Sequence, residues 1–225
     1  MEFEEFVLAA VTADLSVELA AREHADAVEF RADLAEDGRS QLSAYEGNLP
    51  LLVTNRIEWE GGEAADEPAR IETLKRAVEH PAVEAVDVEL AAVRAGDCAD
   101  LLEHARTHDV AVVVSVHDFE GMPDRETLSE LLTEAAELGD IGKLAVTAET
   151  RGDVLALLSA THEATATGRT VATMAMGEAG RHSRAVAPLY GSRIGYAPVD
   201  PADATAPGQY DLATLRRLID QLQRE

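Results

Sequence analysis

The stretch Ile141-Gly142-Lys143-Leu144-Ala145-Val146 reads as a short buried strand between two turn-forming segments. Similar β-rich runs recur along the chain and alternate with longer segments of helical periodicity. Strands are predicted at residues 6–11, 27–30, 50–54, 85–90, 110–116, 142–146, 170–174 and 192–195, and helices near 17–24, 36–46, 67–79, 98–108, 124–138, 151–164, 180–190 and 211–223. Eight such units predict a parallel α/β structure, a single-domain (β/α)8 TIM barrel over residues 1–225, with a doubly wound open sheet as the alternative.

Lys143 is one of only two lysines in the chain, and it lies in a strand where a charged side chain is costly to bury. Arginine cannot replace a primary amine that loses its proton and attacks a carbonyl carbon. Lys143 is therefore a candidate for covalent chemistry through an imine, although an ion-paired or snorkelling structural lysine is the alternative. The other lysine, Lys75, lies beside the apolar stripe of a predicted helix, where a solvated lysine is ordinary.

Polar residues of reactive or ligand-binding types follow most of the predicted strands. In a barrel of parallel strands the active site lies at their carboxyl ends, so these side chains are expected to meet there. They are Glu29, Arg31 and Asp33, Asn55 and Arg56, Asp87 and Glu89, His117 and Asp118, the segment after Met176 with Arg181 and Arg184, and the loop with Gln209. Lys143 comes early in its strand, so its side chain is expected to run inside the barrel toward that end.

The chain of 225 residues has 43 acidic and 19 basic residues, a formal net charge of −24. Such a charge repels nucleic acid and anionic membranes, so neither is an expected partner. An acidic N-terminus, the lack of a long apolar run and a single cysteine, Cys98, predict a soluble cytoplasmic protein. Few lysines and a diffuse acidic surface are typical of proteins from salt-loving organisms, and an ordinary acidic cytosolic protein is the alternative.

These residues, in this order, resemble the type I 3-dehydroquinate dehydratases of the shikimate pathway of aromatic amino-acid biosynthesis. The resemblance extends over most of the chain, through residues 29–33, Arg56 with 60–62, 87–90, 115–119, 143–146, 174–184, 190–192 and 206–209. It implies a (β/α)8 barrel, usually a homodimer, that dehydrates 3-dehydroquinate to 3-dehydroshikimate without a metal or a cofactor.

The resemblance also implies roles for individual residues. Lys143 would form the imine, His117 would transfer protons, and Glu60 would orient His117. The residues implied to hold the substrate are Glu29, Phe30, Arg31, Arg56, Arg184, Thr205 and Gln209. Thr205 stands where the family has a serine. The family's serine near the end of the first strand has no clear counterpart, although Thr12 offers a hydroxyl nearby.

The chemistry also follows from the residue types. An iminium on Lys143 would acidify a neighbouring proton, which His117 would remove before protonating the leaving hydroxyl. We expect an apolar barrel interior flanked by cations to favour the neutral amine. Two alternatives are another imine-forming barrel, such as a class I aldolase, and a barrel that binds a ligand without catalysis. The lack of a glycine-rich phosphate loop disfavours the first, and the pairing of lysine with histidine disfavours the second.

Overall fold

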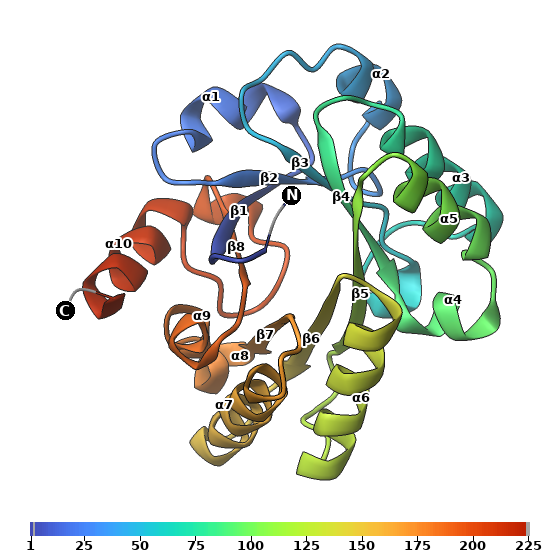
Figure 1. Cartoon of the computed structure of the whole chain (residues 1–225). Coiled ribbons are helices and arrows are strands. Elements are labelled where there is room, and N and C mark those ends of the chain that lie inside the picture. The colour runs from blue at the N-terminus through green and yellow to red at the C-terminus, as the bar shows by residue number, and fades with distance from the viewer. Residues whose placement is uncertain (2, 224–225) are drawn as a thin grey trace.

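The computed structural model describes residues 1 and 3–223, and eight parallel strands form the sheet at its centre (Figure 1). The strands are β1 (Val7–Thr12), β2 (Ala27–Arg31), β3 (Leu51–Thr54), β4 (Val83–Glu89), β5 (Ala111–Asp118), β6 (Ile141–Thr147), β7 (Val171–Met176) and β8 (Ile194–Pro198). Their order, β7-β6-β5-β4-β3-β2-β1-β8, follows the sequence around a ring. The prediction of a single-domain (β/α)8 barrel is therefore confirmed, and the open doubly wound sheet is excluded.

Helices and short 3₁₀ turns connect the strands and cover the outside of the barrel (Figure 1). The α-helices are α1 (Glu18–Ala21), α2 (Gly38–Ser43), α3 (Glu67–Val78), α4 (Leu90–Ala95), α5 (Ala99–Thr107), α6 (Arg125–Leu138), α7 (Arg151–Ala166), α8 (Gly177–Gly180), α9 (Ser183–Val186) and α10 (Leu212–Gln223). The 3₁₀ turns are η1 (Leu15–Val17), η2 (Glu58–Glu60), η3 (Ala187–Tyr190) and η4 (Pro201–Asp203).

The long helices begin where side-chain caps satisfy their first free N–H groups. Asp66 caps α3 and Asp124 caps α6, while Thr150 and Asp153 form a capping box at the start of α7. Several predictions of local structure were wrong, two of them among the helices. Leu90 begins α4 instead of ending β4, and the single helix predicted at 180–190 is divided among the short elements α8, α9 and η3.

The barrel closes only partly between β7 and β8. A single bridge joins Val171 to Ser192 there, and the Ser192 hydroxyl accepts a hydrogen bond from the Thr173 N–H at 2.9 Å. The eighth strand was predicted at 192–195 but runs from Ile194 to Pro198, because Ser192 belongs to this closing contact and not to the strand. The shift brings Tyr196 into the middle of β8.

Strand alternation divides the core into two layers, because successive side chains point to opposite faces of a strand. The layer inside the barrel includes Ala27, Leu52, Ala85, Val113, Ile141 and Ala172. Two residues further along their strands, on the same face, are Glu29, Thr54, Asp87, Ser115, Lys143 and Met174. An apolar plug at the amino ends of the strands thus supports a polar layer nearer their carboxyl ends.

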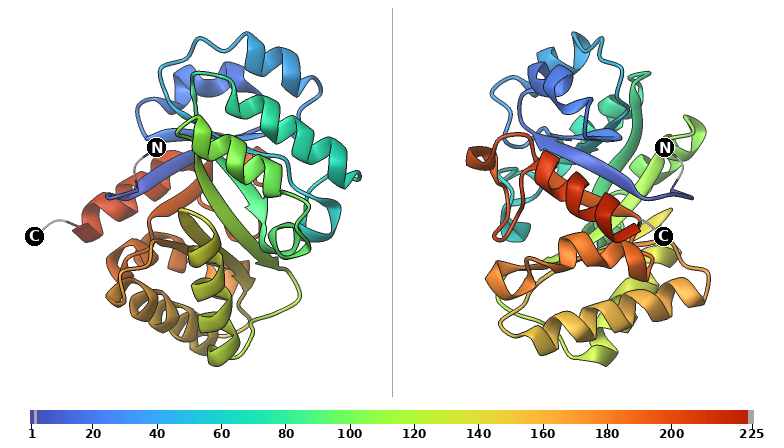
Figure 2. Two further views of the ribbon diagram at one scale, coloured as in Figure 1. Left: turned by 45° about the vertical axis from the view of Figure 1, so that its right-hand side comes forward. Right: turned by 90° about the vertical axis from the view of Figure 1, so that its left-hand side faces the viewer.

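The outer core lies between the sheet and the helices. On one side of the barrel, α10 covers β1 and β8, where Leu212, Leu215 and Ile219 pack with Leu8 and Ala10 (Figure 2). On another side, Leu128 of α6 and Leu157 of α7 pack on the outer faces of β6 and β7. Among the helices of residues 1 and 3–223, none has the length and apolar character needed to cross a membrane.

Candidate active site

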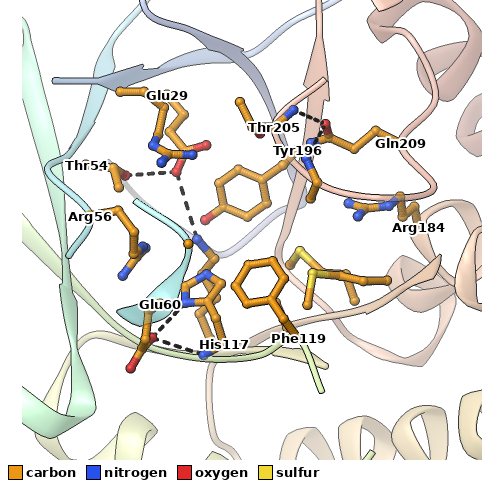
Figure 3. Close-up of a pocket in the computed structure, with 17 residues that line it drawn as sticks. Glu29, Thr54, Arg56, Glu60, His117, Phe119, Arg184, Tyr196, Thr205 and Gln209 are labelled. Carbon is orange, nitrogen blue, oxygen red and sulfur yellow. Dashed lines mark hydrogen bonds and ion pairs between the residues drawn. The ribbon is translucent and has the colours of Figure 1, made fainter. Parts of the chain in front are cut away.

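A pocket opens at the carboxyl ends of the strands and collects nine of the ten residues predicted for catalysis or substrate binding (Figure 3). The other strand-end residues that the sequence singled out are not among its lining residues, namely Asp33, Asn55, Asp87, Glu89, Asp118 and Arg181. The three predicted catalytic residues, Lys143, His117 and Glu60, line it. So do six of the predicted substrate-binding residues, namely Glu29, Arg31, Arg56, Arg184, Thr205 and Gln209. Residues from most of the strands and from the 205–209 loop therefore converge on one cavity.

Phe30 is the one predicted binding residue that the structure places elsewhere. Its side chain is fully buried in the outer core, where it packs with Val28, Val53 and their neighbours. The reason is the strand alternation of β2, because Glu29 and Arg31 face the inside of the barrel and Phe30 between them must face out. The expectation that the Phe30 side chain contacts a substrate is therefore wrong.

Lys143 extends from β6 into the polar layer, as the sequence predicted, but its surroundings differ from the expectation. Its ammonium Nζ donates to Asp87 Oδ2 at 2.9 Å and lies 3.9 Å from Glu29 Oε1. The same atom lies 4.3 Å from the centre of the Tyr196 ring. The predicted apolar site flanked by cations is thus wrong, because a buried ammonium needs paired carboxylates to offset its lost hydration.

Asp87 is the centre of a buried network of charges. Besides Lys143, it accepts hydrogen bonds from Ser115 Oγ at 2.6 Å and from Arg56 at 2.7 Å. Burial by itself raises the pKa of this carboxyl, but the nearby charges of Arg56 and Lys143 outweigh burial and hold the pKa well below its ordinary value. Asp87 therefore stays ionised while Lys143 is charged.

Arg56 lines the pocket, but its guanidinium already donates hydrogen bonds to three buried side chains of the protein. One of its nitrogens donates both to Glu89 Oε1 and to Ser115 Oγ at 2.8 Å, and the other donates to Asp87. Beyond it, Arg70 lies 2.6 Å from the second oxygen of Glu89. These contacts extend the ion-pair network from the pocket through Glu89 to α3, and Arg56 holds Asp87 in place beside Lys143.

His117, at the end of β5, contacts Glu60 through two nitrogens. Its backbone N–H donates to Glu60 Oε2 at 3.1 Å, and its ring Nδ1 lies 2.9 Å from the same oxygen. When Glu60 is ionised, this oxygen accepts from both groups, which places the ring proton on Nδ1 and leaves the Nε2 lone pair free. Burial, with the charges of Arg56 and Lys143, lowers the pKa of His117 well below 6.5, so the ring is neutral near pH 7.

Glu60 is held beside His117 by the turn that follows η2. Gly61 has φ +80°, and a side chain on Gly62 would approach the backbone oxygen of Arg56 to 1.9 Å. Burial is the largest influence on Glu60 and raises its pKa to about 7, although the charge of Arg56 opposes this. The Glu60-Gly61-Gly62 sequence therefore places a carboxyl of raised pKa within hydrogen-bond distance of the imidazole.

Arg184 supplies an unneutralised cation on the opposite side of the pocket (Figure 3). Its guanidinium donates to Pro207 O at 3.3 Å, and no carboxylate within the described residues pairs with it. Burial lowers its pKa to about 10, which leaves it positively charged at neutral pH. Arg31, by contrast, is paired with Asp33 at 2.6 Å. A buried guanidinium without a counter-ion favours binding of an anion.

The 205–209 loop covers the pocket next to Arg184. Gln209 Oε1 accepts hydrogen bonds from the backbone N–H groups of Thr205 and Ala206, at 2.9 and 3.2 Å. Gly208, with φ +78°, makes the turn possible and approaches the backbone of Gly177. Thr12, considered as a substitute for a first-strand serine, lies outside this pocket and bonds to the backbone of Asp14.

Several residues of the pocket were not predicted as site residues. Thr54 and Tyr196 were not considered, whereas Phe119, Met174 and Met176 appeared only within segments that carry the family resemblance. Asp87 and Glu89, which contact Arg56 without lining the pocket, were recognised only as strand-end acids. Thr54 donates to Glu29 Oε1 at 2.8 Å and so fixes that carboxylate. The alternation of side chains along a strand could have identified two of these residues. Thr54 precedes Arg56 by two residues, and Asp87 precedes Glu89 by two, so each pair lies on one face of its strand. Tyr196 was missed because β8 was predicted two residues too early.

The geometry combines an amine nucleophile, a neutral imidazole with a free lone pair and an unpaired guanidinium. Such a set suits addition to the carbonyl of an anionic substrate and proton transfer next to it. Across residues 1 and 3–223, no group of three or more His, Cys, Asp or Glu side chains is arranged to hold a metal ion.

A family model described as type I 3-dehydroquinase matches residues 9–225. The chain belongs to the type I 3-dehydroquinase family. It is thus an enzyme of the type I 3-dehydroquinate dehydratase class, and the resemblance seen in the sequence is confirmed. Lys143 and His117 both line the pocket at the carboxyl ends of the strands.

Two curated relatives support the assignment over the whole chain. The 3-dehydroquinate dehydratase of Haloarcula marismortui is 59% identical over 228 residues and covers 100% of both chains. That of Halobacterium salinarum is 54% identical over 226 residues, covering 99% of this chain and 100% of the relative. Both come from halophilic archaea, in agreement with the acidic, lysine-poor composition.

Solved structures of the family share the fold. The crystal structure of 3-dehydroquinate dehydratase from Geobacillus kaustophilus has a TM-score of 0.87 and 31% identity, covering 98% of this chain and 92% of that chain. A type I enzyme from Clostridium difficile, solved with covalent modified comenic acid, has a TM-score of 0.83 and 26% identity, covering 97% of this chain and 92% of that one.

Proposed function

We propose that the enzyme dehydrates 3-dehydroquinate to 3-dehydroshikimate, as a step of the shikimate pathway, through an imine between the substrate and Lys143. The observation that carries this proposal is the placement of Lys143 and His117 in one pocket with an unpaired cation, Arg184. The substrate is a hydroxylated ring that bears both a ketone and a carboxylate. These two groups match the amine at one side of the pocket and the guanidinium at the other.

The reaction begins with loss of a proton from the Lys143 ammonium, for which the Glu29 carboxylate, 3.9 Å away, is the neighbouring acceptor, because Asp87 keeps its negative charge. The amine adds to the ketone carbon, and loss of water gives an iminium that withdraws electrons from the adjacent carbon. The Nε2 atom of His117 then takes a proton from that carbon. The electron pair forms the new C=C bond as the C–O bond of the leaving hydroxyl breaks.

His117 completes the cycle by returning its proton to the departing hydroxyl, which leaves as water. Addition of water to the conjugated iminium releases the ketone product and regenerates the Lys143 amine. Glu60 holds the ring with Nδ1 protonated and stabilises the imidazolium that forms in between. Glu29, Arg31, Arg56, Thr205 and Gln209 border the same space and are proposed to contact the hydroxyls and carboxylate of the substrate.

Borohydride trapping tests the imine directly. Reduction in the presence of substrate or product should inactivate the enzyme irreversibly, and digestion with mass spectrometry should locate the adduct on the peptide containing Lys143. Lys143→Arg should abolish turnover, because the guanidinium stays protonated. Lys75→Arg is the control, since Lys75 lies on α3 with its nearest acid, Glu72, 3.9 Å away. An adduct on Lys75, or normal turnover of Lys143→Arg, would falsify the proposed mechanism.

The absorbance of the product separates this reaction from the two alternatives. Incubation with 3-dehydroquinate should produce the ultraviolet band of a conjugated enone. A class I aldolase reaction would instead release carbon–carbon cleavage products, and a barrel that only binds its ligand would give neither. Covalent attachment in the family is supported by the relative from Clostridium difficile, which is described with covalent modified comenic acid. A homodimer and a cytoplasmic location remain predictions, the first of which sedimentation in high salt would test.

A further inference from the structure

The hydroxyl of Tyr196 is buried in the pocket without a hydrogen-bond partner. The residue is only 4% exposed, and its phenolic oxygen has no partner among residues 1 and 3–223. An unpaired buried hydroxyl is unfavourable, because the group has given up its hydrogen bonds to water. A phenylalanine would fill the same volume without this cost, so packing alone does not account for the oxygen atom.

The position of the ring ties this hydroxyl to the reacting amine. The Lys143 Nζ atom lies 4.3 Å from the centre of the Tyr196 ring. Figure 3 shows the hydroxyl end of the ring pointing into the pocket, toward the side where Glu29 and Arg56 lie and away from Thr205 and Gln209. The hydroxyl therefore lies on the side of the pocket to which the amine and its carboxylate partners are confined.

Tyr196 is fixed in this place by the strand that carries it. In β8 it pairs in register with Ala9 of β1, and both side chains face the inside of the barrel. Burial raises the pKa of its hydroxyl well above 10, and the charges of Glu29 and Asp87 act in the same direction. Tyr196 is thus a neutral phenol at neutral pH, a hydrogen-bond donor that keeps its proton.

We propose that Tyr196 donates a hydrogen bond to the oxygen of the carbonyl carbon that Lys143 attacks. This inference rests on the imine chemistry proposed above. As the lysine nitrogen forms its bond to carbon, the electron pair of the C=O π bond moves to oxygen, which becomes negatively charged. A donor placed beforehand at that oxygen stabilises the charge as it develops. The phenol itself does not transfer its proton. The oxygen takes one proton from the attacking nitrogen and one from the carboxyl group that received the ammonium proton, and it then leaves as water.

The variant Tyr196→Phe tests the proposal, because it removes one oxygen atom and keeps the ring beside Lys143. We expect imine formation to slow about tenfold to hundredfold, the usual effect of losing one donor to a developing charge. The rate is measured by mixing enzyme with substrate, quenching with borohydride after milliseconds to seconds and quantifying the Lys143 adduct. The melting temperature should stay the same or rise, since the lost hydroxyl was unpaired in the folded protein.

Tyr45→Phe is the matched control. The Tyr45 hydroxyl donates to Leu49 O at 2.7 Å and lies outside the pocket. Its loss should lower the melting temperature and leave the rate of imine formation unchanged, the reverse of the result expected for Tyr196. A merely structural role for the Tyr196 hydroxyl would give the same pattern in both variants.

Two results overturn the inference. If Tyr196→Phe forms the adduct at the wild-type rate, the hydroxyl does not assist the addition step, even if a later step is slowed. If its adduct forms slowly only because the melting temperature has collapsed, the hydroxyl has a folding role instead. Failure of the wild-type enzyme to form any adduct would contradict the proposed function itself, so the two failures are distinguishable.

Discussion

The Nζ atom of Lys143 lies 2.9 Å from Oδ2 of Asp87, and both side chains are almost completely buried. The contact holds the amine at the end of a long side chain in one place. It also means that the nucleophile is stored as an ion pair and has to pass a proton on before it can react. The apolar site that a reactive lysine suggests in a sequence is replaced here by a network of compensating charges.

Replacing Asp87 with asparagine should strongly destabilise the protein. The substitution leaves Lys143 and Arg56 as buried cations that share the remaining acids, a situation that typically costs about 3–5 kcal/mol. Chemical denaturation at pH 7 measures the loss. The exposed pair of Arg94 and Glu134 provides the control, because Glu134→Gln should cost less than about 1 kcal/mol. Equal losses of unfolding free energy in the two variants would contradict the prediction that breaking a buried ion pair costs more than breaking an exposed one.

The variant His117→Ala should nearly abolish turnover and still allow the imine to form. The amine binds the substrate covalently, whereas the imidazole moves the protons, a contribution of about 10²–10⁴-fold. Mass spectrometry after borohydride should therefore detect an adduct on Lys143 even though enone formation is lost. Turnover at the wild-type level would remove His117 from the mechanism.

Glu60→Gln should change how stability depends on pH. The pKa of Glu60 is raised from 4.5 to about 7 in the folded protein, so folding favours the protonated carboxyl. Its contribution to the free energy of unfolding is therefore fully present below about pH 4.5 and is lost as the pH rises through about 7. That difference corresponds to about 3 kcal/mol as an upper limit. His117, with its lowered pKa, acts in the opposite sense, being destabilising below about pH 6.5.

The difference between wild type and Glu60→Gln isolates the carboxyl, because His117 is present in both. We expect the wild type to lose up to about 3 kcal/mol relative to the variant between pH 4.5 and 8, measured by urea unfolding. The turnover of the variant should also fall by about tenfold or more, since an amide cannot stabilise the imidazolium as a carboxylate does. A pH-independent difference would show that Glu60 is ionised throughout this range.

Local patterns predicted most of the fold and most of the site. Each of the eight strands was found because an apolar run of β-forming residues has a clear end, and the polar residues at those ends identified the pocket. Errors appeared where local signals were weak. Gly195 and Ser192 gave little strand preference, so β8 was shifted and Tyr196 was overlooked. The alternation of β2 already indicated that Phe30 faces outward from its position between Glu29 and Arg31.

The partners of Lys143 could not be read from local patterns. Asp87 and Glu29 reach it from β4 and β2, across strands whose relative height is set by the stagger of the closed sheet. The same holds for Arg56, which appeared free to bind substrate in the sequence but meets Glu89 and Ser115 inside the barrel. Which strand faces which, and at what height, depends on long-range contacts that a single segment does not encode.

Salt should stabilise the protein. With a net charge of −24, screening by ions weakens repulsion among the surface carboxylates. We expect the melting temperature to rise by at least about 4–8 °C between 0.1 and 3 M KCl, corresponding to about 2 kcal/mol for a domain of this size. A series with sorbitol at matched osmolality controls for exclusion of a cosolute. A flat or falling curve with KCl would contradict adaptation to high salt.

Arg184→Met should weaken substrate binding without harming the fold. The guanidinium is buried, and no carboxylate among the described residues pairs with it. Burial also lowers its pKa, so the charge of Arg184 does not stabilise the fold of the substrate-free protein. Methionine fills similar apolar space, and we expect an equal or higher melting temperature. Loss of a charge-assisted hydrogen bond to the substrate carboxylate should raise KM about tenfold to hundredfold and change kcat less. The companion variant Arg184→Lys, which keeps a positive charge, should recover part of this loss. If KM stays at the wild-type value in Arg184→Met, the carboxylate binds elsewhere in the pocket and Arg31 or Arg56 must hold it.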